Sequence, residues 1–497
     1  MSETARAGSP SGGRIAGATW LSGTPLVVNA ISLLANLVII PGLGQDGWGA
    51  WSTAVGLSGA TTFLTGIGLR PLFIRALARA AGPAERERLV GAQLALRLMF
   101  AVGAGAIAIL IGLLLGYSAT IMTCVAIAAT GIIPAVVWTT FSDVLNAEEA
   151  FRASALATLV SGLVLTGATV VVVLAGLGPV GVAGAYFIGP LLTALQLGVA
   201  MRRRGLPVRP HWDRAEMRRL VREARLTAAG DGIGVVVTRL RDVYIPALVT
   251  PPVYGLYVTG QLLVSRLNIV GDALITAYAP GLARDHEVLR TGRPSWASAT
   301  VMRLLMLSGI ILAVGSLAVA AWFTGLIYRE ADEAAARHAA LVVMAITSLS
   351  LPLVTLQMGW RQLLIAVDEH DLAARCAGTA ALVGGAATFG LTLLDGVRGA
   401  AFGVVVASVA AAALTGRAAW RVLGQAAAVP ALGAGTAALL AGLAVAALAV
   451  RLGIGVGGAM ATVLAPVLTI ALVIALGGVQ RAELRELATR LRRRRAG

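Results

Sequence analysis

Residues 255–284 read GLYVTGQLLVSRLNIVGDALITAYAPGLAR, a stretch long and apolar enough to cross a bilayer as one helix. Polar residues recur here, and just upstream, at every third or fourth position. They are Tyr254, Tyr257, Gln261, Ser265, Asn268 and Asp272. This spacing predicts a helix with a continuous polar stripe, because residues three or four apart share one helical face.

The rest of the chain has the same apolar character. It is 58% hydrophobic, has a mean hydropathy of +0.84 and is only 13% charged, whereas soluble domains carry roughly 25% charged residues. Helix is the expected state, because an open strand edge in lipid leaves backbone groups unpaired. The sequence therefore predicts an all-α polytopic membrane protein with about fourteen spans. The expected spans are 15–40, 47–69, 89–115, 119–146, 153–175, 180–201, 226–249, 253–280, 298–323, 338–360, 372–394, 398–416, 428–450 and 453–478.

The arginines predict an orientation. All 40 basic residues are Arg, which indicates a bacterium with GC-rich coding, and 31 of them lie in or beside alternate connections that include both termini. Only four lie in the opposite set. Because cytoplasmic connections are rich in Arg, both termini and residues 202–225 are expected in the cytoplasm of a cell with this protein in its plasma membrane.

An internal repeat predicts the domain organisation. GAWSTAV begins at Gly49 and its span leaves the membrane at Arg79, while GLYVTGQ begins at Gly255 and leaves at Arg284, an offset of 206 or 205 residues. Six spans separate the two, which predicts two parallel six-helix lobes related by a pseudo-two-fold axis along the membrane normal. The expected parts are 1–201 (first lobe), 202–225 (basic connection), 226–421 (second lobe), 422–478 (two added helices) and 479–497 (basic amphipathic tail).

Several ionisable residues fall inside expected spans, where each charge costs at least about 2.5–3.5 kcal/mol. Arg239 and Asp242 stand three residues apart, so they can pair, whereas Arg241 lies on nearly the opposite side of the helix from Arg239. Such residues usually line a cavity, which predicts a wet, cationic chamber for an anionic group. The alternative is a set of internal ion pairs and interhelical hydrogen bonds. Arg97, Arg303 and Arg361 lie near cytoplasmic ends, where they are expected to snorkel to water.

No cofactor or metal site is predicted. Cys124 and Cys376 are far apart, the four histidines form no cluster, and no glycine-rich nucleotide loop occurs. The net charge of +16 predicts membrane lipids as the partner, and not nucleic acid. The basic tail, 479–497, is expected to lie on the anionic inner leaflet.

Two stretches resemble the polysaccharide and lipid-linked oligosaccharide flippases of the multidrug/oligosaccharidyl-lipid/polysaccharide (MOP) exporter superfamily. They are GQDGWGAWSTAVGLSGATTFLTGIGLRPLFIRALAR (44–79) and RDVYIPALVTPPVYGLYVTGQLLVSRLNIVGDALITAYAPGLAR (241–284). The resemblance implies a two-lobed, non-enzymatic exporter that moves a polyprenyl-diphosphate-linked glycan to the outer leaflet by alternating access. Glycosyltransferases or a glycan polymerase are implied partners. The first two spans lack the intramembrane basic residues expected of the lipid II branch, apart from Arg70 and Arg75 at the inner end, which favours the oligosaccharide branch.

On this hypothesis Arg239, Arg241 and Arg266 attract the diphosphate, and Gln261, Asn268 and Tyr257 contact sugars. Asp231, Asp242 and Asp272 bind a coupling cation or hold the arginines in place. A lipid II flippase, a multidrug/cation antiporter and a membrane-embedded glycosyltransferase stay as alternatives. The hypothesis requires guanidinium groups that are open to an incoming ligand, not sealed in the protein.

Overall fold

The computed structural model describes residues 10–66, 69–80, 82–148, 150–330 and 333–429, with single positions up to 469. Every regular element in these ranges is helical. Nine helical stretches in the described part of the chain are long and apolar enough to cross a membrane, which confirms the predicted all-α polytopic class. Most of the two last expected spans and the whole tail, 479–497, lie outside the described residues.

The chain divides into two compact units, Met1–Gly255 and Leu256–Gly497. The boundary falls inside helix α8 (Pro251–Leu267), so helix α7 (Arg214–Leu248) is counted with the first unit. This grouping reflects packing of α7 against α1 (Pro10–Thr62), α2 (Leu69–Arg79) and α3 (Pro83–Leu114). The expected division into lobes, and the pseudo-two-fold, stay predictions.

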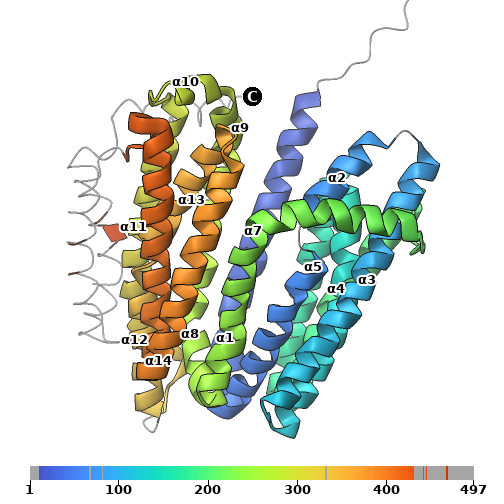
Figure 1. Cartoon of the computed structure of the whole chain (residues 1–497). Helices are drawn as coiled ribbons and strands as arrows, with labels where there is room; N and C mark the ends of the chain where they lie inside the picture. Colours follow the sequence, from blue (N-terminus) through green and yellow to red (C-terminus); the bar gives the residue numbers. More distant parts are fainter. Residues whose placement is uncertain are drawn as a thin grey trace, which may run out of the picture. The chain divides into compact units, whose positions relative to one another are not determined.

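In the first unit, α1 contains the expected span 15–40 and most of the expected span 47–69, joined at Gly44. Gly44 has φ 66° and ψ 176°, a backbone conformation that a residue without a side chain adopts most easily. After α1 come a 3-10 turn, η1 (Phe63–Thr65), then α2, α3, α4 (Ala119–Ala147), α5 (Phe151–Leu174) and α6 (Gly178–Arg203). Helix α4 packs against α3 and α6, and α5 packs against α1 and α6 (Figure 1).

Helix α7 begins in the basic connection and continues into the expected span 226–249. Asp213 caps it, because its carboxylate accepts hydrogen bonds from the backbone N–H groups of Ala215 at 3.0 Å and Glu216 at 3.1 Å. The apolar side chains of this first part, Met217, Leu220 and Ala224, are buried against α2 and α3. The connection is therefore partly a packed amphipathic helix.

The second unit contains the rest of α8, then α9 (Ile269–Arg284), α10 (His286–Arg290), α11 (Trp296–Ile327), α12 (Ala334–Ser348), α13 (Leu351–Ala366), α14 (His370–Leu423) and η3 (Gly424–Ala427). Two expected spans are interrupted: 253–280 at Asn268, and 338–360 just before Pro352, which has no backbone N–H to continue a helix. Conversely, α14 contains two expected spans that meet at Asp395 and Gly396. Helix α13 packs between α11 and α14.

Candidate functional site

The α7 charge cluster consists of Arg239, Arg241 and Asp242, in the half of α7 that the sequence places in the membrane. Arg239 Nη1 lies 3.8 Å from Asp242 Oδ2, and Arg241 Nε lies 3.8 Å from Asp242 Oδ1. The two arginines leave the helix on nearly opposite sides, yet both long side chains reach the one carboxylate. The Arg239 side chain is 50% exposed, while those of Arg241 and Asp242 are about half as exposed.

These ion pairs are loose. A separation of 3.8 Å exceeds the range of an N–H···O hydrogen bond, so neither contact fixes the geometry of the guanidinium group. One carboxylate stands between two guanidinium groups, which leaves a local charge of +1. The three arginines and three aspartates predicted for the site have no net charge together. Asp231 is too distant to belong to the cluster, because it precedes Arg239 by eight residues, roughly 12 Å along a helix. The side chain of Asp231 lies outside the described residues.

The backbone of the cluster packs closely against α1. A methyl group on Gly56 would lie 3.2 Å from the Asp242 carbonyl oxygen and 2.9 Å from the Tyr254 hydroxyl, so a glycine is needed for this contact. Pro246, four residues after Asp242, has no N–H to donate to that carbonyl. Beside the cluster, α7 therefore lacks one backbone hydrogen bond and packs closely against α1.

The polar stripe on α8 and α9 has a buried end and an open end. Tyr257 is buried, and Gln261 Nε2 donates a hydrogen bond of 2.6 Å to its hydroxyl. Arg266 and Asp272 are exposed, and Asn268 lies at the break between the two helices. The tyrosine and glutamine therefore form an internal pair, whereas Asp272, the one charged member of the stripe, and the neighbouring Arg266 are exposed.

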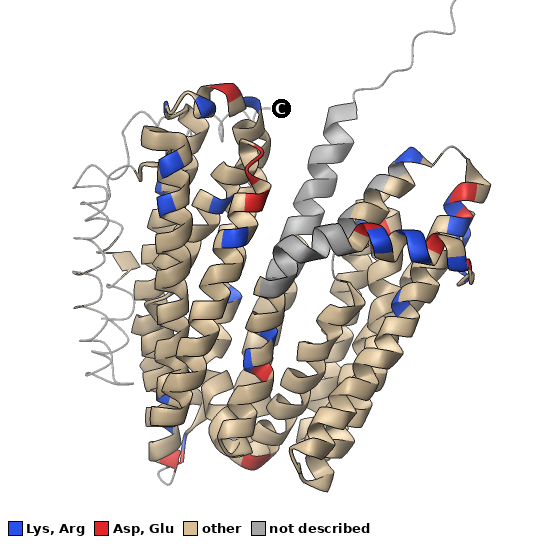
Figure 2. Ribbon diagram, viewed as in Figure 1, with Lys and Arg blue, Asp and Glu red and all other residues tan. Residues whose placement is uncertain are grey.

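The structure brings together Arg239, Arg241 and Asp242 in the first unit, and it places the polar stripe, apart from Tyr254, in the second. Figure 2 shows that charged residues are sparse along the spanning helices and gather at helix ends and connections, so the α7 cluster is unusual in its setting. The Arg239 side chain is half exposed and Arg266 is exposed, so neither is sealed inside its own unit, and binding of an anion by these residues stays a prediction. The assignment of one common chamber stays a prediction.

A buried ion pair was missed by the sequence reasoning. Arg97 Nη1 donates to Thr140 Oγ1 at 3.2 Å and to Asp143 Oδ2 at 3.3 Å, and the Arg97 and Asp143 side chains are only 4% and 3% exposed. The expectation that Arg97 snorkels to water is therefore wrong, since a carboxylate on α4 satisfies it internally. Arg303 is also buried, so the expectation that its side chain snorkels to water is wrong as well.

The sequence contained only part of the signal for the Arg97–Asp143 pair. Helices α3 and α4 are joined by the short connection 115–118, so they run antiparallel and a carboxylate lies on the helix next to Arg97. Arg97 lies 17 residues before the end of α3 and Asp143 lies 24 residues after the start of α4, a difference of roughly 10 Å along the helices. The spacing therefore did not predict that these two residues pair.

Comparison with known proteins identifies the fold. No family model and no curated protein sequence matches the chain. Among solved structures, a lipid II flippase MurJ in an inward closed conformation aligns with a TM-score of 0.73 at 12% identity, covering 93% of this chain and 99% of that one. A multidrug resistance MATE family transporter of the MOP superfamily aligns with a TM-score of 0.62 at 13% identity, covering 81% and 97%. This chain has the MOP transporter fold.

A third MOP-fold structure is a transporter from Pyrococcus furiosus, with a TM-score of 0.54, 13% identity and coverage of 82% and 95%. That transporter is described as having a binding pocket of reversed polarity, which suggests a different function for it. Each of these three structures aligns with this chain over 95% or more of its own length. The expected fold is therefore confirmed.

Proposed function

We propose that this chain is a flippase that moves a polyprenyl-diphosphate-linked oligosaccharide or polysaccharide precursor from the cytoplasmic to the outer leaflet by alternating access. The observation that carries the proposal is the α7 charge cluster. Two guanidinium groups share one carboxylate at 3.8 Å, and the Arg239 side chain is half exposed in a helix that the sequence places in the membrane.

The charge of the cluster selects an anionic cargo. At 3.8 Å one ion pair has an interaction energy of about 4 kcal/mol at an effective dielectric of 20 and about 1 kcal/mol in water. A diphosphate brings further negative charge and can engage a guanidinium group through two parallel hydrogen bonds, a geometry the present pairs lack. A cationic drug would instead meet a local positive charge, which disfavours the antiporter alternative.

The geometry supports a division of roles. Each carboxylate oxygen of Asp242 faces one arginine, which favours a role in holding Arg239 and Arg241 over binding a coupling cation. Asp231 and Asp272 stay as candidates for ion coupling. On the second unit, Arg266 is proposed to contact the diphosphate, and Gln261, Asn268 and Tyr257 are proposed to position the sugars.

Lipid II is the second candidate cargo. The MurJ structure covers 93% of this chain, against 81% for the MATE transporter, which favours a flippase-like chain length. Spans 15–40 and 47–69 contain no basic residue, however, and this absence favours an oligosaccharide carrier. Both cargoes present a diphosphate to the same arginines.

The test is transport in proteoliposomes that carry a fluorescent polyprenyl-diphosphate oligosaccharide, with lipid II and a cationic dye as competing cargoes. Arg239→Gln is expected to lower the rate about 10- to 100-fold, because a hydrogen bond to a charged group contributes about 1.5–3 kcal/mol. Arg239→Lys should retain part of the rate. Arg337→Gln, an exposed arginine on α12, is the matched control and should transport normally.

Three outcomes would contradict the proposal. A wild-type rate in Arg239→Gln would remove the assigned role of the cluster. Transport of the dye but not of the glycan would identify an antiporter. A change in the mass of the glycan during the assay would identify a glycosyltransferase.

A further inference from the structure

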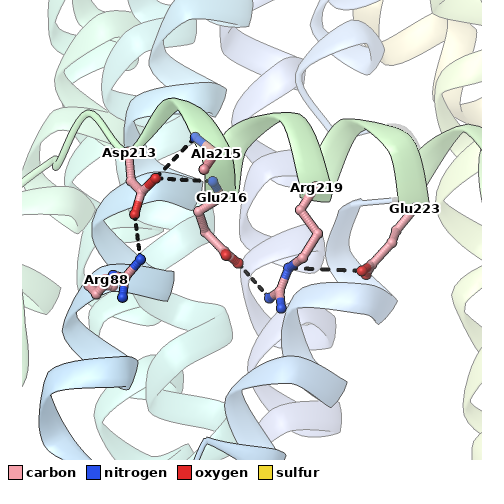
Figure 3. Close-up of polar contacts among 6 residues, drawn as sticks. All are labelled: Arg88, Asp213, Ala215, Glu216, Arg219 and Glu223. Atoms are coloured by element: carbon pink, nitrogen blue, oxygen red, sulfur yellow. Dashed lines mark hydrogen bonds and ion pairs between the residues drawn. The ribbon is translucent and has the colours of Figure 1, made fainter.

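The first turns of α7, together with Arg88 of the neighbouring helix α3, carry arginines of two kinds. In the first kind, each arginine is paired: Arg219 contacts Glu216 at 2.5 Å and Glu223 at 3.9 Å, and Arg88 of α3 contacts Asp213 at 2.8 Å (Figure 3). These three acidic residues are the only ones in 213–224. Two arginines therefore engage every carboxylate that this segment offers.

The second kind forms the arginine stripe, which consists of Arg214, Arg218 and Arg222. The spacing of four residues places all three on one face of the helix, and all three are exposed. In the described part of the chain none of them forms an ion pair, because the nearby carboxylates are engaged by Arg219 and Arg88. Like charges at this spacing repel each other, so the stripe favours an anion beside it.

The arginine stripe lines a cavity of about 540 Å³ in the first unit. The remaining lining is apolar: Leu96 and Met99 come from α3, Met217 and Val221 from α7, and Trp212 precedes the helix. Met99 and Trp212 are exposed although they are large and hydrophobic. The cavity thus combines three cations with an apolar wall formed by α3 and the first turns of α7.

We propose that this cavity binds an anionic membrane phospholipid, with its headgroup phosphate on the arginine stripe and an acyl chain along Leu96, Met99 and Trp212. A soluble anion would satisfy the arginines but would leave the exposed apolar side chains in water. A neutral lipid would cover those side chains but leave the positive charge unbalanced. Only an amphipathic anion matches both halves of the lining.

The expected topology places the cavity beside anionic phospholipid. The distribution of arginines predicts that 202–225 lies in the cytoplasm, beside the anionic inner leaflet. Tryptophan side chains favour the membrane–water interface, which fits the place of Trp212 next to the stripe. The site is separate from the α7 charge cluster and does not depend on the identity of the cargo.

The test measures binding of phosphatidylglycerol with a fluorescent acyl chain to the full-length protein in a non-ionic detergent, where no anionic surface is present. The cavity variant is Arg214→Gln/Arg218→Gln/Arg222→Gln. The matched control is Arg202→Gln/Arg203→Gln/Arg204→Gln, which removes the same charge from exposed positions of the same connection that do not line the cavity. The cavity variant should bind about tenfold or more weakly, since each arginine contributes several-fold in affinity for an anionic headgroup. The control should bind as the wild type does.

A second variant, Met99→Gln, replaces an exposed side chain and so leaves the packed core intact. It should weaken phosphatidylglycerol binding while the arginine stripe is unchanged. Equal losses in the two triple variants, or equally tight binding of phosphatidylcholine, would overturn the site. Displacement of the labelled lipid by inorganic phosphate, or unchanged binding in Met99→Gln, would show a site for free phosphate and refute the lipid.

Discussion

Removing the positive partner of the buried pair in the first unit should destabilise that unit strongly. In Arg97→Met, the carboxylate of Asp143 keeps its buried position, with only 3% of its side chain exposed, and loses the guanidinium group 3.3 Å away. At that distance the lost interaction is about 5 kcal/mol for an effective dielectric of 20. Breaking a buried pair by truncating one partner generally costs about 3–5 kcal/mol, which agrees with this value.

The double variant Arg97→Met/Asp143→Leu separates electrostatics from packing. Replacing both partners by apolar side chains of similar volume is generally neutral or stabilising. The double variant should therefore be more stable than Arg97→Met, although it carries one more substitution. Thr140, whose hydroxyl accepts a hydrogen bond from Arg97 and also donates to the Val136 carbonyl, keeps a partner in both variants.

The first unit contains its own probe of unfolding. Cys124 on α4 is completely buried and free, so its reaction with a thiol-specific dye on heating reports opening of this helix pair. The measurement uses a Cys376→Ser background, in which Cys124 is the one remaining thiol. Arg152→Met, at an exposed position of α5, is the control and should react like the parent. If Arg97→Met is as stable as the parent, or the double variant is no better than the single one, the pair is not the stabilising contact argued here.

Two further predictions concern packing and pH. Gly49→Ala should destabilise the first unit by about 1–3 kcal/mol in the same thiol assay, because the added methyl group would clash with the backbone of Pro251. Gly59→Ala, on the same helix, is the control and should not destabilise the unit, because a methyl group there meets open space. Equal destabilisation by the two substitutions would refute the argument. The hydrogen bond from Arg88, with backbone hydrogen bonds, lowers the pKa of Asp213 below its usual value of about 3.9, so its stabilisation is present above that pH and is lost as the pH falls through the lower folded value. Asp213→Asn should lose this acid dependence in unfolding measurements between about pH 5 and pH 2, and an unchanged acid profile would contradict the assignment.

The positions of single helices could be predicted closely from the sequence. The expected span 119–146 corresponds to α4, Ala119–Ala147, and 153–175 corresponds to α5, Phe151–Leu174. Both are mainly apolar runs bounded by short polar or glycine-containing connections, so their hydrophobicity and length define their ends closely. A spanning helix has to be apolar and long enough to cross the bilayer, and both properties can be read from the local sequence.

The departures arise where a local backbone choice or a distant residue decides the structure. The breaks at Asn268 and before Pro352 lie inside runs whose overall hydrophobicity and length predict one continuous span each. Asn268 belongs to the polar stripe and Pro352 lacks a backbone N–H, but neither feature alone requires a helix to end. The burial of Arg97 depends on Asp143, which lies 46 positions later in the chain. For the candidate site, the helical spacing predicted that Arg239 and Asp242 pair, but it did not predict that Arg241 reaches the same carboxylate. Side-chain length and helix neighbours decide such contacts, and neither is visible in a periodic pattern.

The paired and unpaired arginines of the first unit together argue for function. Where a charge serves packing, this protein supplies a close partner: Arg97 has a carboxylate and a hydroxyl within 3.3 Å, and Arg219 is placed between two glutamates. The α7 charge cluster has one carboxylate for two guanidinium groups, and the arginine stripe forms no ion pair in the described part of the chain; both keep exposed guanidinium groups. Uncompensated positive charge in such places destabilises the protein alone, and it becomes favourable when an anion binds. A chain that balances its structural arginines so closely is expected to leave others unbalanced where phosphate-bearing ligands bind.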